Sequence, residues 1–264
     1  MRNYFTRSIH KFEKNIINED ATIAKKNMIA VSDGAGGGGV FADRWSKYLL
    51  MKLPASPISS FKELDAWVDS IWEPFYNECE IEAKERGGLF LEKFYDEGSF
   101  ATLAAAWKTS ETEWKWMTYG DSVVFCYDKN TGLLCYSPIH LTDFDTPPYL
   151  ISDKDPLNEV GFKHGCFNVS ENSTIFAATD ALAHYILMMY EISKREFYKG
   201  EISNAIAAKT KSSNYIDLAM SMRFSFPSIL CSLLDRQTEF RSKMRKLENT
   251  GLLAHDDYSI AVAE

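Results

Sequence analysis

Short polar links between consecutive strand-like segments constrain this chain more than any other feature. The segments are rich in β-branched and aromatic residues and bounded by turn residues, which predicts strands over residues 99–110, 113–121, 122–130, 132–138, 173–180 and 257–264. The links KTSETE (108–113) and DKNTG (128–132) are shorter than the roughly dozen residues that a parallel crossover needs. They favour hairpins, so we expect an antiparallel sheet.

Residues 60–88 predict a long amphipathic helix. Ser60 precedes Glu63 by three positions, as in an N-terminal capping box, and Gly87 and Gly88 end the segment. Apolar residues recur between these ends with helical spacing, at Leu64, Trp67, Val68, Ile71 and Phe75, and Pro74 lies among them. Strands grouped around long helices without strict βαβ alternation indicate an α+β layered fold.

Length and charge limit the class of protein. At 264 residues the chain can bury one sizeable core, and no linker or charge block divides it, so we expect a single domain over residues 1–264 and a monomer. The net charge of -8 argues against nucleic acid as a partner. No apolar run approaches the roughly 18 residues of a membrane span, and the N-terminus lacks the apolar core of a signal peptide. We therefore expect a cytoplasmic protein with no membrane partner.

A glycine-rich stretch follows the apolar run of residues 28–32 and precedes a segment with helical spacing. Gly34-x-Gly36-x-x-Gly39 matches the dinucleotide-binding pattern, which alone would suggest a nucleotide-dependent oxidoreductase. Asp33 stands directly before it, and its carboxylate would repel a pyrophosphate. The same carboxylate suits a hard cation. The local sequence of this loop is compatible with two kinds of ligand, a phosphate or a metal ion.

Acidic residues recur at the ends of the predicted strands. They are Glu19 with Asp20, Asp33, Asp121, Asp180 and Asp257. Any one of them could simply cap a turn or a helix. Several carboxylates at strand ends beside a glycine-rich turn are what a magnesium or manganese site needs, because a buried carboxylate is costly unless a cation or hydrogen bonds compensate it. Taken together, the acidic residues favour a metal site.

Five motifs carry a resemblance to a known family. NEDA (18–21), VSDGAGG (31–37), YGDSVVF (119–125), AATDAL (177–182) and DDYSIAVAE (256–264) resemble, in this order, the successive motifs of the metal-dependent protein phosphatases of type 2C. The order is more specific than any single motif. The resemblance implies a four-layer αββα sandwich, in which two antiparallel sheets are flanked by helices, with a metal centre at one edge.

The resemblance also implies a role for each acidic residue. Asp33 resembles the carboxylate shared by two metal ions, Mn²⁺ or Mg²⁺, with the Gly34 carbonyl as a further ligand. Asp180 and Asp257 resemble the other direct ligands, and these three aspartates are the catalytic candidates. Glu19 and Asp20 resemble the acidic pair that holds the first ion through water, and Asp121 a ligand of a third ion. The implied reaction is hydrolysis of phosphoserine or phosphothreonine in a phosphorylated protein substrate by a water that bridges the two ions.

Two adjacent aspartates, Asp256 and Asp257, are alternative metal ligands in the last motif. Successive side chains of a strand point to opposite faces, so Asp256 and Asp257 do not both face one metal ion. The motif alignment selects Asp257.

Two departures from the family concern catalysis. Many members have an arginine that binds substrate phosphate five residues before the aspartate of the acidic pair. This chain has Asn15 there, next to Lys14, a point charge that lacks the bidentate geometry of a guanidinium. Where some members have a histidine after Asp-Gly, this chain has Ala35. These departures motivate an alternative function, a regulatory or binding module that keeps the phosphatase fold with weak or no turnover.

The segment DFDT, Asp143 to Thr146, fits the nucleophile motif of the haloacid dehalogenase-type phosphatases, in which the first aspartate becomes phosphorylated. That motif should follow a buried parallel strand. Here prolines follow it and the context is rich in turn residues, so we interpret it as a loop.

Overall fold

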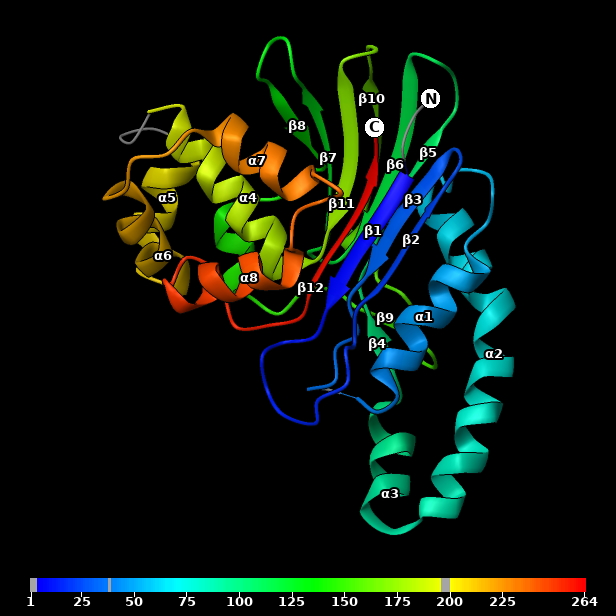
Figure 1. The fold of residues 1–264 in the computed structure, drawn as a ribbon. Coiled ribbons are helices and arrows are strands. Elements are labelled where there is room, and N and C mark those ends of the chain that lie inside the picture. The colour runs from blue at the N-terminus through cyan, green and yellow to red at the C-terminus, as the bar shows by residue number, and fades with distance from the viewer. Residues whose placement is uncertain (1–3, 38, 196–199) are drawn as a thin grey trace.

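The computed structural model describes residues 4–37, 39–195 and 200–264, which form two five-stranded sheets stacked face to face (Figure 1). The first sheet has the order β1–β12–β11–β7–β8, and each neighbouring pair is antiparallel. Its strands are β1 (Tyr4–Ile9), β12 (Tyr258–Ala263), β11 (Ser173–Ala178), β7 (Val123–Asp128) and β8 (Leu134–Tyr136).

The second sheet has the order β10–β6–β5–β3–β2 and is antiparallel throughout. Its strands are β10 (Phe162–Asn168), β6 (Glu113–Tyr119), β5 (Leu103–Lys108), β3 (Met28–Ser32) and β2 (Ala21–Lys25), and a separate short pair joins β4 (Phe100–Ala101) to β9 (Ile151–Ser152). The predicted segment 99–110 is therefore two strands. The antiparallel pairing predicted from the short links is confirmed.

The central strands are apolar on both faces because each lies between the other sheet and a layer of helices. In β11, Ile175 and Ala177 belong to the core between the sheets, whereas Phe176 and Ala178 belong to the core under the helices. Alternating side chains of one strand thus enter two different cores. This explains why β11 reads in sequence as a continuous apolar run.

Helices cover both outer faces (Figure 1). The second sheet is covered by α1 (Ala42–Lys52), α2 (Phe61–Arg86) and α3 (Gly88–Glu97), which share a core with it. The first is covered by α4 (Asp180–Ser193), α5 (Glu201–Ala208), α6 (Lys211–Met220), α7 (Phe226–Leu234) and α8 (Phe240–Asn249). Single turns of 3-10 helix occur at η1 (Leu141–Asp145) and η2 (Glu159–Gly161). This arrangement confirms the predicted four-layer αββα sandwich.

Local signals set the ends of α2 as predicted. The Ser60 hydroxyl accepts a hydrogen bond from the Glu63 amide, and the Glu63 carboxylate accepts one from the Ser59 amide. Gly87 ends the helix with a φ of 61°, a left-handed value that favours glycine. Pro74 lies inside the helix, which continues past it.

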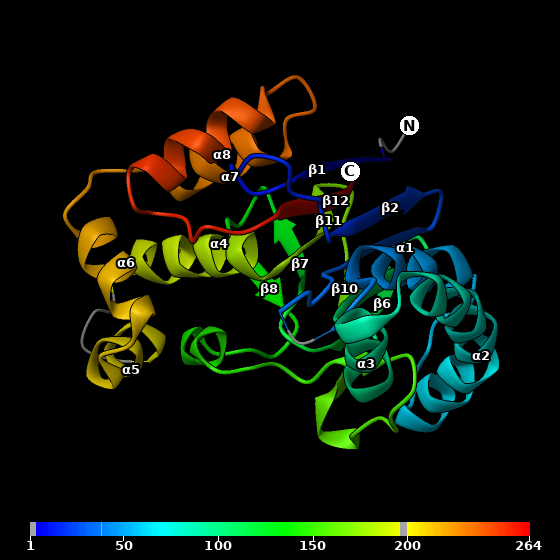
Figure 2. The same cartoon turned by 90° about the horizontal axis from the view of Figure 1, so that it is seen from below.

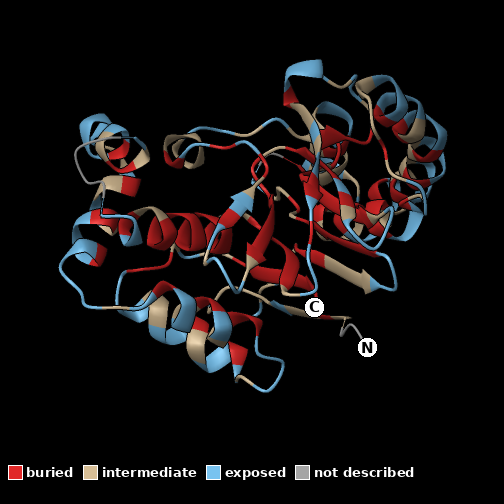
Figure 3. Cartoon of the chain, turned by 90° about the horizontal axis from the view of Figure 1, so that it is seen from above, coloured by how far each residue is buried: buried red, intermediate tan, exposed pale blue. Residues whose placement is uncertain are grey.

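The helices of the first sheet differ in burial. Nearly all of α4 is buried, and the strands and α4 are mostly red in Figure 3, whereas α5–α8 keep an exposed outer side. Asp143 and its neighbours lie in η1 and the loop after it, and no sheet of the described residues contains a parallel pair that could precede a dehalogenase-type nucleophile.

Among the helices of the described residues, none is both long and apolar enough to cross a membrane.

Candidate metal centre

The acidic residues predicted from sequence are brought to one edge of the two sheets, seen from below in Figure 2. Asp20 directly precedes β2 and Asp33 directly follows β3; the pairing of Ala21 with Ser32 makes them neighbours. The first sheet supplies Asp180, two residues after β11, and Asp256, two residues before β12. Antiparallel pairing places the end of β11 beside the start of β12, since the Thr179 amide donates to the Ser259 carbonyl at 3.2 Å.

Asp121 joins this edge from the end of β6. The link runs through Thr102, whose amide donates to the Asp33 carbonyl at 2.8 Å and whose hydroxyl lies 2.7 Å from the hydroxyl of Ser122. Strand ends of both sheets therefore converge on one place.

The carboxylates of the acidic edge raise one another's pKa values. Desolvation is the main cause that raises the pKa of Asp33 well above its usual value, and the negative charges of Asp20, Asp180, Asp121 and Asp256 raise it further. The pKa of Asp180 is raised in the same way, by desolvation and then by Asp121, Asp256 and Asp20. Buried carboxylates that lie close together are stabilised when they bind protons or a metal cation, because their negative charges are then neutralised.

Two carboxylate oxygens at this edge are buried without a hydrogen bond in the described part of the chain. One is Oδ1 of Asp20, whose Oδ2 accepts from the Thr179 hydroxyl at 2.9 Å; the other is Oδ1 of Asp121. Burial raises the pKa of Asp20 to about 7 and that of Asp121 to about 6. An unsatisfied buried acceptor costs about 1 to 3 kcal/mol, more if charged, so both oxygens gain from a cation.

The structure distinguishes Asp256 from Asp257. Both oxygens of Asp257 accept backbone hydrogen bonds at 2.7 Å, Oδ1 from Lys11 and Oδ2 from Glu19. The charge of Asp256 raises the pKa of Asp33, Asp121 and Asp180, whereas the charge of Asp257 raises that of Glu19 and Asp20. Asp257 also holds two chain segments together through its hydrogen bonds.

The glycine-rich loop makes room for Glu19. A Cβ on Gly36 would overlap the Glu19 carboxylate, and one on Gly34 would stand 2.7 Å from the Glu19 carbonyl oxygen. The pKa of Glu19 is raised, mainly by desolvation, although the backbone of Gly36 acts to lower it. Gly36 is thus explained by the approach of a carboxylate, and Gly34 by that of the backbone carbonyls of Glu19 and Ala42.

The predicted phosphate-binding residues lie in the turn between β1 and β2. Lys14 and Asn15 are exposed there, and Asn15 has a φ of 59°. Lys11 is a basic residue that acts on the acidic edge: its charge lowers the pKa of both Glu19 and Asp256 against the effect of burial, and His255 also lowers that of Asp256. Within the described ranges the Lys11 ammonium has no ion pair or hydrogen bond of its own. The sequence analysis missed Lys11 because its position near the acidic edge depends on a tertiary contact, the hydrogen bond from its backbone amide to Asp257.

The donor set fits a hard divalent cation. The proposed ligands are carboxylate and carbonyl oxygens, and none of them is a cysteine or a histidine. Such a donor set suits Mg²⁺ or Mn²⁺ better than Zn²⁺. Among the described residues, no group of three His, Cys, Asp or Glu side chains is arranged so that it could hold a metal ion. The fit to a cation therefore rests on the burial and charge of the acidic residues and on the two oxygens without a hydrogen bond.

Solved structures share this arrangement of layers. The catalytic domain of the serine/threonine protein phosphatase PstP, in complex with two manganese ions, aligns over 100% of this chain and 97% of that chain, with a TM-score of 0.55 and 14% identity. The Mycobacterium tuberculosis phosphatase PstP/Ppp aligns over 100% and 98%, with a TM-score of 0.53 and 14% identity. The chain has the type 2C phosphatase fold.

A serine/threonine phosphatase from S. agalactiae shows the same phosphatase fold, with a TM-score of 0.55, 13% identity and coverage of 100% of this chain and 99% of that chain. No protein-family model matches the sequence, and no curated protein matches it significantly. The likeness to these phosphatases is therefore one of fold.

Proposed function

We propose that residues 1–264 form one metal-dependent serine/threonine protein phosphatase domain, which acts on phosphorylated protein substrates as a cytoplasmic monomer. The observation that carries this proposal is the gathering of desolvated, mutually repelling carboxylates at one edge of the phosphatase fold. A site that concentrates negative charge in this way is suited to bind cations, and a substrate phosphate then approaches cations instead of bare carboxylates.

Each acidic residue has a place in this proposal. Asp33, Asp180 and Asp256, with the Gly34 carbonyl, would hold two Mn²⁺ or Mg²⁺ ions. Glu19 and Asp20 would contribute through water, and Asp121 would serve a third ion. Bound cations of this kind lower the pKa of a shared water and neutralise charge on the phosphoryl oxygens. Asp257 positions the site, because its two hydrogen bonds fix the backbone of Lys11 and Glu19.

Lys11 is the phosphate-binding residue in this proposal. Its ammonium acts on the acidic edge while making no ion pair within the described residues, so it is available to an anionic ligand. Lys14 and Asn15, the candidates from sequence, are exposed in the neighbouring turn. An ammonium supplies charge without the bidentate geometry of a guanidinium, so capture of the phosphate is expected to be weak.

The proposal is tested by assaying wild type, Asp33→Asn and Asp180→Asn on p-nitrophenyl phosphate and a phosphoserine peptide with Mn²⁺. We expect both variants to lose about a hundredfold or more of kcat, as is typical when charge stabilisation of a transition state is removed. A chelator should abolish the wild-type activity. Activity that persists in the chelator or in both variants would overturn the proposal.

The alternative function, a regulatory or binding module with weak or no turnover, is favoured by Ala35 and Asn15, which stand where some members of the resembled family have a histidine and an arginine. The same assay decides between the two functions. Binding of Mn²⁺ and of the peptide without turnover would identify a binding module.

A further inference from the structure

Phe41 joins the glycine-rich loop to α1 in a backbone conformation that an aromatic residue rarely adopts. Its φ is 56° and its ψ is 27°, which is the left-handed region, and it directly precedes the first residue of α1. A Cβ carries a steric penalty in this region, so glycine is its usual occupant and a bulky side chain there is strained. Such strain persists only where the surrounding structure holds the residue in place.

The ring of Phe41 is held by the helices that cover the second sheet (Figure 1). Phe90 and Phe94 of α3 contact it edge to face, with ring centroids 5.3 and 6.1 Å away. The guanidinium groups of Arg44 on α1 and Arg86 on α2 lie 4.9 and 5.6 Å from its centroid. Edge-to-face ring pairs and cation–π pairs are both attractive. These contacts therefore compensate the strain at Phe41.

Arg44 connects this cluster of rings to α2. Its guanidinium pairs with Glu78 at 2.6 Å and with Glu82 at 2.7 Å. Glu82 also pairs with Arg86, whose guanidinium lies 4.5 Å from the ring centroid of Phe90. Single ion pairs at a surface contribute little, but a network of them fixes the groups that it joins. The start of α1 is thus held against both α2 and α3.

The first two turns of α1 contact two residues of the acidic edge. The hydroxyl of Ser46, which is buried, donates to the Glu19 carbonyl at 2.5 Å. The same carbonyl accepts from the Gly34 amide at 3.2 Å. A Cβ on Gly34 would stand 2.6 Å from the Ala42 carbonyl oxygen, so the loop lies against the backbone of α1. A displacement of α1 would therefore move Glu19 and Gly34.

We propose that Phe41 is a positioning residue of the metal centre: its contacts with α3 maintain the left-handed turn that places α1 against Glu19 and Gly34. This inference rests on the proposed phosphatase function, since Glu19 and Gly34 are proposed to serve the metal ions. Without the ring contacts, the backbone at residue 41 gains free energy by leaving the left-handed region. The start of α1 then shifts, and the fraction of protein that is competent to bind the ions falls.

The test compares two substitutions at the same position. Phe41→Ala and Phe41→Gly both remove the ring, but only alanine keeps the Cβ that disfavours the left-handed region. Mn²⁺ is titrated into the metal-free full chain by calorimetry, and Tm is measured on the same samples. We expect Phe41→Ala to bind Mn²⁺ about five- to tenfold more weakly than wild type and Phe41→Gly to stay within about twofold of it. A role in packing alone predicts the same affinity for both variants.

Phe90→Ala covers the case in which Phe41→Ala does not fold. It removes a ring contact and leaves Phe41 strained, so it should also weaken Mn²⁺ binding, whereas in the Phe41→Gly background it should have no further effect. Phe61→Ala is the matched control, because it removes an aromatic residue of α2 whose ring contacts Phe162 instead, and it should leave the affinity unchanged.

Equal affinities of Phe41→Ala and Phe41→Gly would overturn the inference, as would a Phe90→Ala variant that binds Mn²⁺ as tightly as Phe61→Ala does. Lower Tm values with unchanged affinities would restrict Phe41 to packing and would overturn it too. Each of these results requires that wild type binds Mn²⁺ and leaves the proposed function intact. Failure of wild type itself to bind Mn²⁺ would refute the proposed function, and the inference with it.

Discussion

At the scale of single residues, one shift in register changes the chemistry of a side chain. Asp256 and Asp257 are adjacent in sequence, yet the charge of Asp256 acts on Asp33, Asp121 and Asp180, while Asp257 accepts hydrogen bonds from two backbone amides of the β1–β2 connection. Loss of Asp257 would release these amides, whereas loss of Asp256 would remove charge beside Asp33. The two residues should therefore respond differently to the same substitution.

Asp256→Asn is expected to weaken Mn²⁺ binding about tenfold or more, because it removes a direct ligand charge. Asp257→Asn retains one acceptor oxygen and should chiefly lower stability, with Tm reduced by a few degrees and a smaller loss of affinity. Calorimetric titration of Mn²⁺ into metal-free protein, with thermal unfolding of each variant, measures both effects. The opposite order of affinities would restore Asp257 as the ligand.

Lys11→Ala is expected to raise KM for p-nitrophenyl phosphate about three- to tenfold at fixed Mn²⁺, because a partly exposed charge-assisted contact is lost. Lys14→Ala is the matched control and should have little effect, since Lys14 is exposed in the turn. Asn15→Arg would improve kcat/KM only if the turn reaches the bound phosphate. A larger effect of Lys14→Ala than of Lys11→Ala would contradict the assignment.

At the scale of elements, the sequence predicts the central strands and α2 well, because their apolar patterns and the caps of α2 are local. It does not predict α3 or α4–α8, whose helices depend on packing against the sheets and on one another. The edge strands β1 and β10 were also missed, since β10 carries polar residues such as Lys163 and the exposed His164 within its pattern. The acidic edge could be predicted from strand ends, whereas the positions of Lys11 and Phe41 depend on tertiary packing.

The glycine-rich loop gives a prediction at this scale. Gly36→Ala should displace the Glu19 carboxylate, because the added methyl group would occupy its place, and weaken Mn²⁺ binding about tenfold. Gly37→Ala is a close control, since a Cβ there meets no atom within 4 Å. Titration calorimetry with both variants checks this expectation. Equal affinities for the two variants would show that Glu19 has no part in binding the metal.

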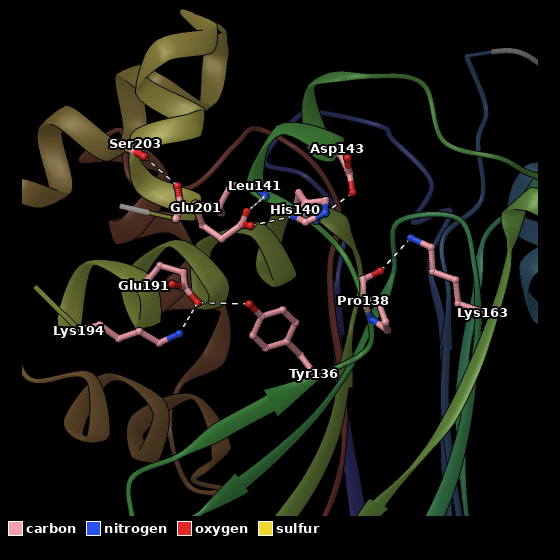
Figure 4. A network of polar contacts seen from close by, with 11 residues as sticks. Tyr136, Pro138, His140, Leu141, Asp143, Lys163, Glu191, Lys194, Glu201 and Ser203 are labelled. Atoms are coloured by element: carbon pink, nitrogen blue, oxygen red, sulfur yellow. Dashed lines mark hydrogen bonds and ion pairs between the residues drawn. The ribbon is translucent and has the colours of Figure 1, made fainter. Parts of the chain in front are cut away.

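At the scale of the whole molecule, the acidic edge couples stability to pH. Raised pKa values mean that the folded state binds more protons than the unfolded state between the usual aspartate pKa and about 7, so the metal-free protein loses stability as pH rises through this window. His184 acts in the opposite direction below pH 6.5, because its pKa is lowered. Between pH 6 and pH 8, His140 and His255 contribute to the same loss of stability, because hydrogen bonds to glutamates, drawn for His140 in Figure 4, raise their pKa values. The Asp20→Asn variant therefore separates the part of the carboxylates from that of the histidines.

We expect the Tm of chelator-treated protein to fall by about 2 °C or more between pH 6 and pH 8, because one pKa unit corresponds to about 1.4 kcal/mol. Saturating Mn²⁺ should raise Tm most at pH 8, and Asp20→Asn should reduce the slope in its absence. Differential scanning calorimetry measures each of these. A Tm independent of pH in chelator would show that the carboxylates do not repel one another in the folded state.

The pairing of β11 with β12 has a further consequence for the history of the chain. The polypeptide leaves the acidic edge at Asp180 and returns to it at Asp256, so the whole helical excursion begins and ends at one place. The entropy of closing such a loop grows only with the logarithm of its length, about 0.6 kcal/mol for each doubling. Insertions and deletions between the helices can therefore accumulate at small thermodynamic cost, and related chains can keep the acidic edge while they differ widely in the helices beside it.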